Sequence, residues 1–350
     1  MIVSILIFIL IFFILVVSHE FGHFLLAKKN GIHVTEFFVG MGPVLFRFEK
    51  GGTVYSWRLF PIGGACVFEG LAALDDNTGE ETSGAFYKAN VWARFATLLA
   101  GPMFNFILAY LMAVIIVGTC GVVTPVVQSV IEDSGAEAAG LEAGDKILKI
   151  NGKHVYLTED VSFISQMNQR GKALTVQYER AGEKYTTVVV PKFASEEGRY
   201  YMGITTGEYL KCNAGQTFQY AFYTTKYYAD AVFKSLEMLV MGQLTKDDVA
   251  GPVGIVKIVD ETVDYYSQYG ILEVVLSLVN LVLALSVNLG IINLLPLPAV
   301  DGGRLLFVVV EMIRRKPVPV EKEGMVHLVG MVAFLILTVF VMFNDITRFL

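Results

Sequence analysis

The sequence opens with a run of residues long enough to cross a lipid bilayer. Residues 1–17 contain one serine and otherwise only apolar side chains, and the apolar character continues to Lys28. About 20 apolar residues span the hydrocarbon core of a bilayer. A cleaved signal peptide would need a basic segment first, but the first 27 residues hold no Lys or Arg. We therefore expect a retained transmembrane helix over residues 1–27.

Three further apolar blocks of similar length follow, at residues 95–118, 271–297 and 326–343. Hydrophobic residues make up 54% of the chain, whereas an ordinary soluble domain is roughly 45–50% apolar. The formal charge of −6 leaves no basic footprint, so nucleic acid is excluded as a partner. The pattern predicts a polytopic α-helical membrane protein with about four transmembrane helices. The lipid bilayer is therefore an expected partner.

The basic residues next to these blocks predict an orientation. They follow the first block, precede the second, and separate the third from the fourth: Lys28, Lys29, Lys88, Arg94, Arg304, Arg314, Arg315, Lys316 and Lys322. Residues 119–135, after the second block, hold no Lys or Arg. Because positive residues stay in the cytoplasm, the loops 28–94 and 298–325 are expected there. Both termini and the 119–270 segment are expected outside.

Residues 121–205 read as a small α+β domain inserted between the membrane regions. Short β-like runs lie between glycine-containing turns: Val126–Ile131, Lys146–Ile150, Leu174–Tyr178 and Tyr185–Val190. Residues 159–169 could form a helix. The chain then divides into a membrane region 1–118, the domain 121–205, an amphipathic region 206–270 and a membrane region 271–350. Residues 216–241 repeat apolar side chains at helical spacing, which fits a helix on a membrane surface or against the bundle, or one packed on the soluble domain.

The run His19-Glu20-Phe21-Gly22-His23 carries the strongest chemical signal. On a helix, positions i and i+4 share one face, so both imidazoles can reach one cation. Glu20 can then act as general base toward a water held by a zinc ion. Two buried structural histidines are the alternative, but ionisable residues inside an apolar span are costly and mark function by default.

A catalytic zinc usually has three protein ligands, so a third is needed. His154 lies in the outer domain, His33 just past the first block, and His327 opens the fourth. Asp301 is the better candidate, because two prolines break the third block just before it, on the side where the first helix also ends. A helix N-cap before Gly302 is the alternative role of this aspartate.

These motifs together resemble the site-2 protease family of intramembrane zinc metalloproteases, of the bacterial regulator-of-sigma-E-protease type. HEFGH is similar to the family's HExxH, NLLPLPAVDGG to its NxxPxPxxDG, AGPMFN to its GPxxN, and GPVGI recurs unchanged. The run GLEAGDKILKING resembles the core of a bacterial PDZ domain. The likeness covers nearly the whole chain, with room for one PDZ domain where bacterial relatives carry two.

The resemblance implies zinc ligands His19, His23 and Asp301, with Glu20 as catalytic base. It further implies that Asn293 of the third span contacts the substrate, together with Gly63 and Gly64 of a β-structure over residues 57–67. Pro296 and Pro298, in the loop after the third span, are the other implied substrate contacts. An ordinary cytoplasmic hairpin is the alternative for residues 57–67, and an interhelical hydrogen bond is the alternative for Asn293.

The implied activity is zinc-dependent cleavage of single-span membrane proteins, such as anti-sigma factors or remnant signal peptides, within the bilayer. The expected location is the bacterial inner (plasma) membrane, with the active site toward the cytoplasm and the PDZ domain outside. Two other functions fit parts of the sequence: a catalytically idle relative that binds membrane proteins, and a zinc transporter. Neither would need Glu20 beside the two histidines.

Overall fold

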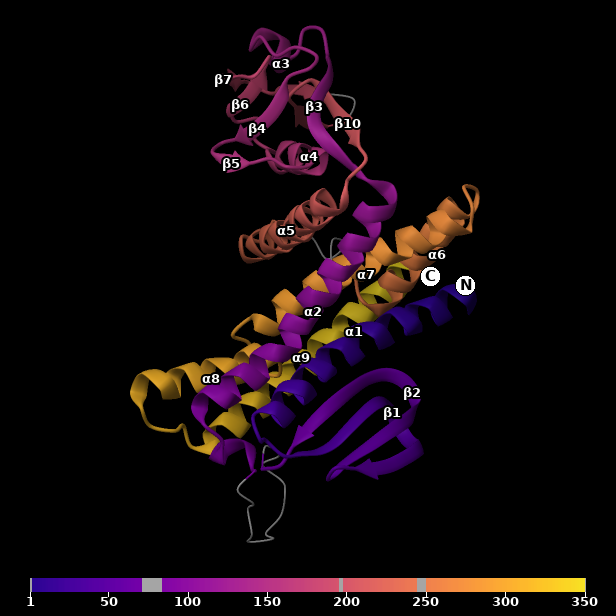
Figure 1. Cartoon of the computed structure of the whole chain (residues 1–350), viewed down its shortest axis with the longest axis vertical. Helices are drawn as coiled ribbons and strands as arrows, with labels where there is room; N and C mark the ends of the chain where they lie inside the picture. The colour runs from indigo at the N-terminus through magenta and orange to yellow at the C-terminus, as the bar shows by residue number, and fades with distance from the viewer. Residues whose placement is uncertain (1, 71–83, 195–197, 244–249, 350) are drawn as a thin grey trace. The chain divides into compact units, whose positions relative to one another are not determined.

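The computed structural model describes residues 2–70, 84–194, 198–243 and 250–349. The chain forms two compact units, one of Met1–Met112 with Val232–Leu350 and the other of Ala113–Ala231. Figure 1 shows the elements of both. The first unit is mainly helical and the second contains most of the strands. Each is described separately below.

Four helices of the described chain are long and apolar enough to cross a membrane. They are α1 (Ile2–Lys29), α2 (Val91–Cys120), α7 (Ile271–Leu294) and α9 (Val320–Phe349). Each corresponds to one of the four apolar blocks, so the expectation of a polytopic helical membrane protein is confirmed. Many of their large apolar side chains are exposed, as expected for helices whose outer faces meet lipid rather than water.

Helix α1 packs against two other helices of its unit. Phe8, Ile11 and Leu15 form a buried cluster with Val259 of α6 (Pro252–Ser267) and Val282 of α7. These α1 positions are three to four residues apart and therefore share one face. Burial of that face fixes the rotation of α1, and with it the direction in which residues 19–23 point.

The GPVGI run forms the start of α6. Asp345 of α9 is fully buried, and its carboxylate accepts hydrogen bonds from the backbone N–H groups of Gly251, at 3.2 Å, and Gly254, at 2.9 Å. A Cβ atom at Gly251 would come within 2.7 Å of this carboxylate. The first turn of a helix leaves N–H groups without helical partners, and here a carboxylate from α9 satisfies two of them.

A long antiparallel hairpin of β1 (Val34–Lys50) and β2 (Thr53–Phe68) follows α1. Residues 34–39 pair on one side with 54–57 and on the other with 64–68. Within the hairpin, the segment 64–68 is therefore an edge. The hairpin also exposes many large apolar side chains: Met41, Val44, Leu45, Phe46, Phe48, Trp57, Leu59 and Phe60. An apolar surface of this kind marks contact with a membrane or a protein partner rather than with water.

The loop between α7 and α8 (Asp301–Arg314) brings the DGG run against its own chain. A Cβ atom at Gly302 would lie 2.1 Å from the Leu295 carbonyl oxygen, and one at Gly303 would lie 2.3 Å from that of Leu297. Only glycine permits this close approach. The loop is thereby folded tightly onto the start of α8. Elsewhere in this unit, the short helix η1 (Phe86–Lys88) precedes α2.

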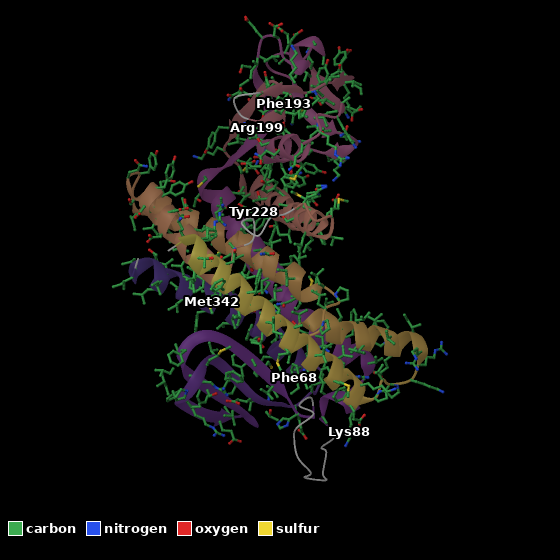
Figure 2. All side chains as sticks on the ribbon, turned by 180° about the vertical axis from the view of Figure 1, so that it is seen from behind. Phe68, Lys88, Phe193, Arg199, Tyr228 and Met342 are labelled. Atoms are coloured by element: carbon green, nitrogen blue, oxygen red, sulfur yellow. The ribbon has the colours of Figure 1, made fainter. Side chains whose placement is uncertain are left out.

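The second unit is an α+β fold built on an antiparallel sheet in the order β10-β3-β4-β6-β7. Its elements are β3 (Val122–Val130), α3 (Gly135–Ala138), β4 (Lys146–Ile150), β5 (Lys153–His154), α4 (Thr158–Met167), β6 (Leu174–Arg180), β7 (Glu183–Val189), β8 (Lys192–Ala194), β9 (Arg199–Tyr201) and β10 (Ile204–Leu210). Alternate residues such as Val127, Ile147, Val176 and Val189 fill its core. The expected inserted α+β domain is therefore present, and Figure 2 marks Phe193 and Arg199 on its β8–β9 hairpin.

Helix α5 (Ala214–Val240) packs on this sheet through its tyrosines. Tyr220, Tyr223 and Tyr227 join a cluster with Tyr156 and the buried Leu157. The rings of Tyr156 and Tyr223 are stacked, with centroids 3.8 Å apart. The sequence left three positions open for this helix: on a membrane surface, against the helix bundle, or on the soluble domain. The tyrosine face of α5 packs on the soluble domain.

Candidate metal centre

Helix α1 presents two buried histidines on one face. His19 and His23 are one turn apart and 8% and 4% exposed, and their ring centroids are 4.8 Å apart. Gly22, between them, lies so close to α2 that a Cβ atom would come within 2.5 Å of the Ala100 carbonyl oxygen. The glycine of HEFGH thus allows the two helices to approach at the level of the imidazoles.

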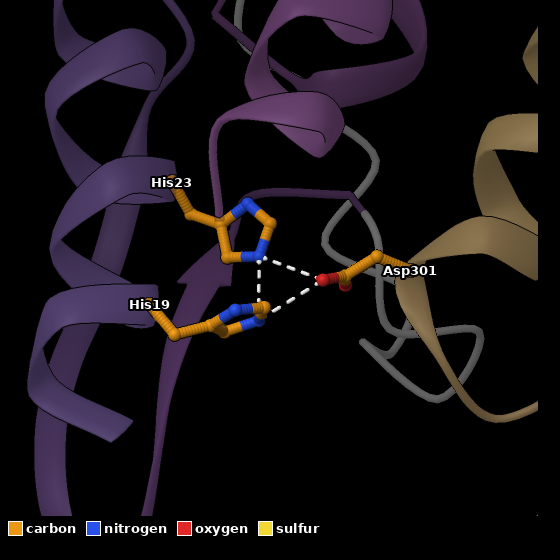
Figure 3. Close-up of side chains that lie close together, drawn as sticks. All are labelled: His19, His23 and Asp301. Carbon is orange, nitrogen blue, oxygen red and sulfur yellow. Dashed lines mark hydrogen bonds and ion pairs between the residues drawn. The ribbon is translucent and has the colours of Figure 1, made fainter. Parts of the chain in front are cut away.

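Asp301 of α8 completes a triangle of donor atoms with these histidines (Figure 3). Its Oδ2 atom lies 3.0 Å from His19 Nε2 and 3.1 Å from His23 Nε2, and the two Nε2 atoms are 3.2 Å apart. Asp301 is the first residue of α8, and Val300 is the N-cap. The alternative role of Asp301 as the helix N-cap is therefore wrong.

This triangle fits a zinc ion. Zinc binds nitrogen and oxygen at about 2.0–2.2 Å, so two ligands at tetrahedral corners lie about 3.3–3.5 Å apart. The observed separations of 3.0–3.2 Å are slightly shorter. Among the described residues, His19, His23 and Asp301 form the group of three metal-ligating side chains that lie close enough together to hold one ion. A small outward shift of each side chain would accommodate zinc.

Hydrogen bonds behind the imidazoles determine which nitrogen faces the triangle. His23 Nδ1 lies 2.8 Å from the Thr97 carbonyl oxygen, which can only accept, so Nδ1 carries the proton and Nε2 keeps its lone pair. His19 Nδ1 lies 3.2 Å from Nδ2 of the fully buried Asn105, and rotating this amide by half a turn would turn its oxygen toward Nδ1. An amide can donate or accept, so Asn105 can support the tautomer of His19 whose Nε2 binds metal.

Gly101 of α2 is needed for the histidines to occupy this position. A Cβ atom there would lie 2.2 Å from His23 Nε2 and 2.8 Å from His19 Cε1. These distances are far below van der Waals contact, so any larger residue would push both rings away. The AGPMFN run thus supplies both the glycine that makes room for the imidazoles and the asparagine that contacts one of them.

Glu20 lies next to the triangle and contacts the β-hairpin. Its Oε2 accepts a hydrogen bond of 2.8 Å from the backbone N–H of Cys66, on the edge segment 64–68 of β2. Gly64 fits closely here, since a Cβ atom would come within 2.9 Å of the Phe38 carbonyl oxygen and 3.7 Å of Glu20 Cγ. Burial, reinforced by the Glu20 charge, raises the pKa of the Cys66 thiol. The thiol is therefore neutral, and the backbone of β2 rather than its cysteine side chain interacts with Glu20.

The other predicted site residues lie at different distances from the triangle. Asn293 Nδ2 is 3.5 Å from His19 Nδ1, so this residue of α7 is at the site. Gly63, with φ of +80°, precedes the edge segment. Pro296 and Pro298 lie in the α7–α8 loop, where Pro298 packs against Gly330 of α9. Among the described residues, no hydrogen bond or close contact joins either proline to the donor atoms.

The remaining histidines occupy other environments. His33 Nδ1 pairs with Glu69 at 2.5 Å, and His154 belongs to the other compact unit. His327 Nδ1 accepts a hydrogen bond from the Ala299 N–H, two residues before Asp301. His327 therefore supports the loop that carries the aspartate, while Asp301 itself forms the triangle.

Sequence reasoning missed three contacts that shape the site: those of Asn105, the Thr97 carbonyl and the Cys66 N–H. The AGPMFN run contained a signal for Asn105, because a buried amide in an apolar span needs a partner. The other two are backbone groups, which any residue type provides, so no side-chain pattern could have indicated them.

Comparison with known proteins identifies the family of the chain. The sequence pattern of peptidase family M50 matches residues 7–337, nearly the whole chain. The chain therefore belongs to peptidase family M50, the site-2 protease family. The expectation of a membrane-embedded metallopeptidase is confirmed.

Two relatives illustrate the extent of the similarity. Zinc metalloprotease RasP of Bacillus licheniformis is 33% identical, with 97% of this chain and 98% of the relative covered. The protein of the same name from Geobacillus kaustophilus is 31% identical, with 99% and 98% covered. A solved PDZ domain of an SdrC-like protein from Listeria monocytogenes matches 24% of this chain and 86% of that domain, at 22% identity and a TM-score of 0.22. Zinc is the metal in the relatives' names.

Proposed function

We propose that the chain is an intramembrane zinc endopeptidase in which His19, His23 and Asp301 bind the metal and Glu20 is the catalytic base. The observation that carries this proposal is the triangle of two Nε2 atoms and one Oδ2 atom with sides of 3.0–3.2 Å. Three protein ligands and an open fourth position are the usual arrangement of a catalytic zinc. All three ligands come from helices of the first unit, which comprises Met1–Met112 and Val232–Leu350.

The chain's own groups supply the proton transfers. Bound zinc supplies a Lewis acid that activates water and polarises the scissile carbonyl. Glu20 takes the proton from the attacking water and returns it to the departing amide nitrogen. The hydrogen bond from the Cys66 N–H keeps one Glu20 oxygen in place and leaves the other carboxylate oxygen to receive the proton. Thr97 and Asn105 hold the imidazoles from behind.

A transmembrane substrate must be unwound before it is cut, because its peptide groups are hydrogen-bonded within a helix. The edge segment 64–68 offers backbone groups that can pair with an extended substrate, beside Glu20. Gly63 and Gly64 keep this edge free of bulky side chains. Asn293 can donate to and accept from a substrate peptide group. Pro296 and Pro298 shape the α7–α8 loop, which leads to Asp301.

The substrates are single-span membrane proteins, such as anti-sigma factors or remnant signal peptides. The protein resides in the bacterial inner membrane as a multi-pass protein. Its flanking basic residues favour both termini and the domain 121–205 outside the cytoplasm, with the metal centre toward the cytoplasmic side. The domain then acts as a size filter that admits substrates whose ectodomain has already been trimmed.

The filter is testable at a cavity of the unit Ala113–Ala231, about 700 Å³ in volume, which Ile131, Val161 and Met202 help to line. Ile131 is 46% exposed, so Ile131→Tyr fills cavity space without disturbing the core. The variant should change which ectodomain lengths are accepted and should leave the rate on a short substrate nearly unchanged. An equal loss on long and short substrates would contradict the filter.

The activity itself is tested with purified protein and a single-span substrate reconstituted in liposomes. We expect one cut inside the apolar segment of the substrate, mapped by mass spectrometry, that disappears when zinc is chelated and returns when zinc is added. A cut confined to the water-exposed flanks would contradict intramembrane cleavage. Substrate binding without cleavage would favour an idle relative, and zinc flux without cleavage would favour a transporter.

A further inference from the structure

A second cavity of the unit Ala113–Ala231, about 500 Å³ in volume, has a basic lining that the proteolytic activity does not use. It lies between the β4–β6–β7 side of the sheet and helix α5. Lys146, Lys149 and Lys184 line it, together with His154 and a single carboxylate, Glu179. The excess of lysines over carboxylates gives the cavity a positive potential.

The strand register explains why the lysines share one face. The pairing of β4 with β6 shifts between Ile147 and Lys149, as at a β-bulge. The extra residue directs Lys146 and Lys149 to the same side, while Ile147 and Ile150 are both buried in the core behind them. A regular strand would place Lys146 and Lys149 on opposite faces.

Three lysines share one carboxylate, Glu179, in this cavity. Lys146 and Lys184 are the cross-strand neighbours of Glu179, yet no ion pair joins either to it or to another described carboxylate. In the same unit, Arg180 is fully engaged with Asp145, at 2.6 Å. The cavity therefore gathers more ammonium groups than its single carboxylate can neutralise.

Stacked rings form the opposite wall of the cavity. The ring centroids of His154 and Tyr156 are 5.8 Å apart, and those of Tyr156 and Tyr223 are 3.8 Å apart, both in near-parallel stacks. Gln219 donates to the Tyr223 hydroxyl at 3.0 Å, so that hydroxyl keeps its own proton for another acceptor. The wall thus presents hydroxyl and amide donors on a rigid apolar backing.

Chain connectivity limits the distance between this cavity and a membrane span. Helix α2 is a membrane span that ends at Cys120, and Pro125 of β3 lines the cavity. Five residues reach at most about 17 Å. The headgroup layer adds roughly 5–8 Å beyond the hydrocarbon core on each side. The cavity therefore lies within about 17 Å of the end of this span, and tyrosine and lysine are residues that commonly meet lipid headgroups.

We propose that this cavity binds the phosphate-ester headgroup of an anionic glycerophospholipid. The lysines pair with the phosphate oxygens, and the Tyr223 hydroxyl and Gln219 donate to the headgroup oxygens. A zwitterionic headgroup carries its own ammonium group, which the lysines repel. The same phosphate chemistry occurs in free phosphate esters, but the short path from the span of α2 favours the lipid as its source.

The test uses the full chain purified in an uncharged detergent. Native mass spectrometry measures retention of phosphatidylglycerol against phosphatidylcholine, with free glycerol phosphate and an acidic peptide as competitors. The site variant replaces Lys146, Lys149 and Lys184 with Gln. The control replaces Arg170, Lys172 and Lys211 with Gln, which removes the same charge from exposed positions that do not line the cavity.

We expect wild type and control to retain phosphatidylglycerol over phosphatidylcholine, and the site variant to lose about tenfold or more in affinity. Equal retention of the two lipids, or an equal loss in the control, would overturn the proposal. Binding of free glycerol phosphate as tightly as the lipid would overturn the lipid as the source. Displacement by the acidic peptide at equal concentration would point to a protein ligand instead. None of these outcomes depends on proteolytic activity.

Discussion

At the scale of single residues, the groups behind the imidazoles matter as much as the donor atoms themselves. The Thr97 carbonyl oxygen can only accept a hydrogen bond, so the proton of His23 sits on Nδ1 and the Nε2 lone pair faces the triangle. The amide of Asn105 can adapt to either tautomer of His19. Partners of this kind typically change metal affinity 10–100-fold when they are removed.

Asn105→Leu keeps the volume of the buried side chain and removes its hydrogen bond to His19. We expect zinc affinity to fall about 10–100-fold, measured by competition with a chelator of known affinity. Thr119→Val is the control in the same helix, because the Thr119 hydroxyl bonds to the Ile115 carbonyl of its own helix. Unchanged affinity in Asn105→Leu would remove Asn105 from the metal centre.

Asp301→Ala should lower zinc content without unfolding the protein. Val300, not Asp301, is the N-cap of α8, so loss of the carboxylate should cost less than the roughly 1 kcal/mol of a lost cap. Metal analysis gives the zinc content. Thermal unfolding with and without zinc provides a second measurement, because only a protein that binds zinc is stabilised by it. Full zinc content and an undiminished zinc-dependent shift would leave the third ligand unidentified.

At the scale of secondary-structure elements, the site depends on how closely α1 and α2 approach. Gly22 of α1 faces the Ala100 carbonyl, and Gly101 of α2 faces both imidazoles. The loop after α7 is closed onto α8 in a similar way by Gly302 and Gly303. These glycines allow helices from distant parts of the sequence to bring their functional groups within 3.2 Å of one another.

Gly101→Ala tests this packing directly. The new Cβ atom would lie 2.2 Å from His23 Nε2, so the rings must move and zinc content should fall severely. Gly118→Ala makes the same change in the same helix, where the nearest neighbour of the new Cβ atom, Thr217 Cγ2, is an ordinary 3.5 Å away. We expect this control to keep its zinc. Equal zinc content in the two variants would show that the histidines tolerate a displaced α2.

At the scale of the whole molecule, the sequence predicted the four spans and the inserted α+β domain because both follow from local patterns. Uncharged runs of bilayer length define α1 and α7, and short runs between glycine turns define β4 and β6. The strand β3 starts at Val122, four residues before the predicted start at Val126, and it contains Pro125, a residue type that strands disfavour.

The parts that could not be predicted depend on contacts between distant segments. Sequence spacing could bring His19 and His23 together, since they share a helix, but only the fold brings Asp301 to them from 278 residues away. The pairing of the Cys66 N–H with Glu20 and the role of Asp345 in holding α6 are tertiary contacts of the same kind. Resemblance to a family supplied the ligand set, whereas the supporting groups emerged from the structure.

The most direct test of the account is Glu20→Gln, measured for zinc content and for cleavage of a reconstituted single-span substrate. The amide keeps the size of the side chain and leaves His19, His23 and Asp301 untouched, but it cannot take a proton from water. Glu49→Gln is the matched control, because Glu49 is an exposed residue of β1. We predict full zinc content in both variants, with the cleavage rate of Glu20→Gln reduced at least about 10²–10⁴-fold and that of the control unchanged. A zinc-loaded Glu20→Gln protein that cuts at nearly the wild-type rate would contradict the account.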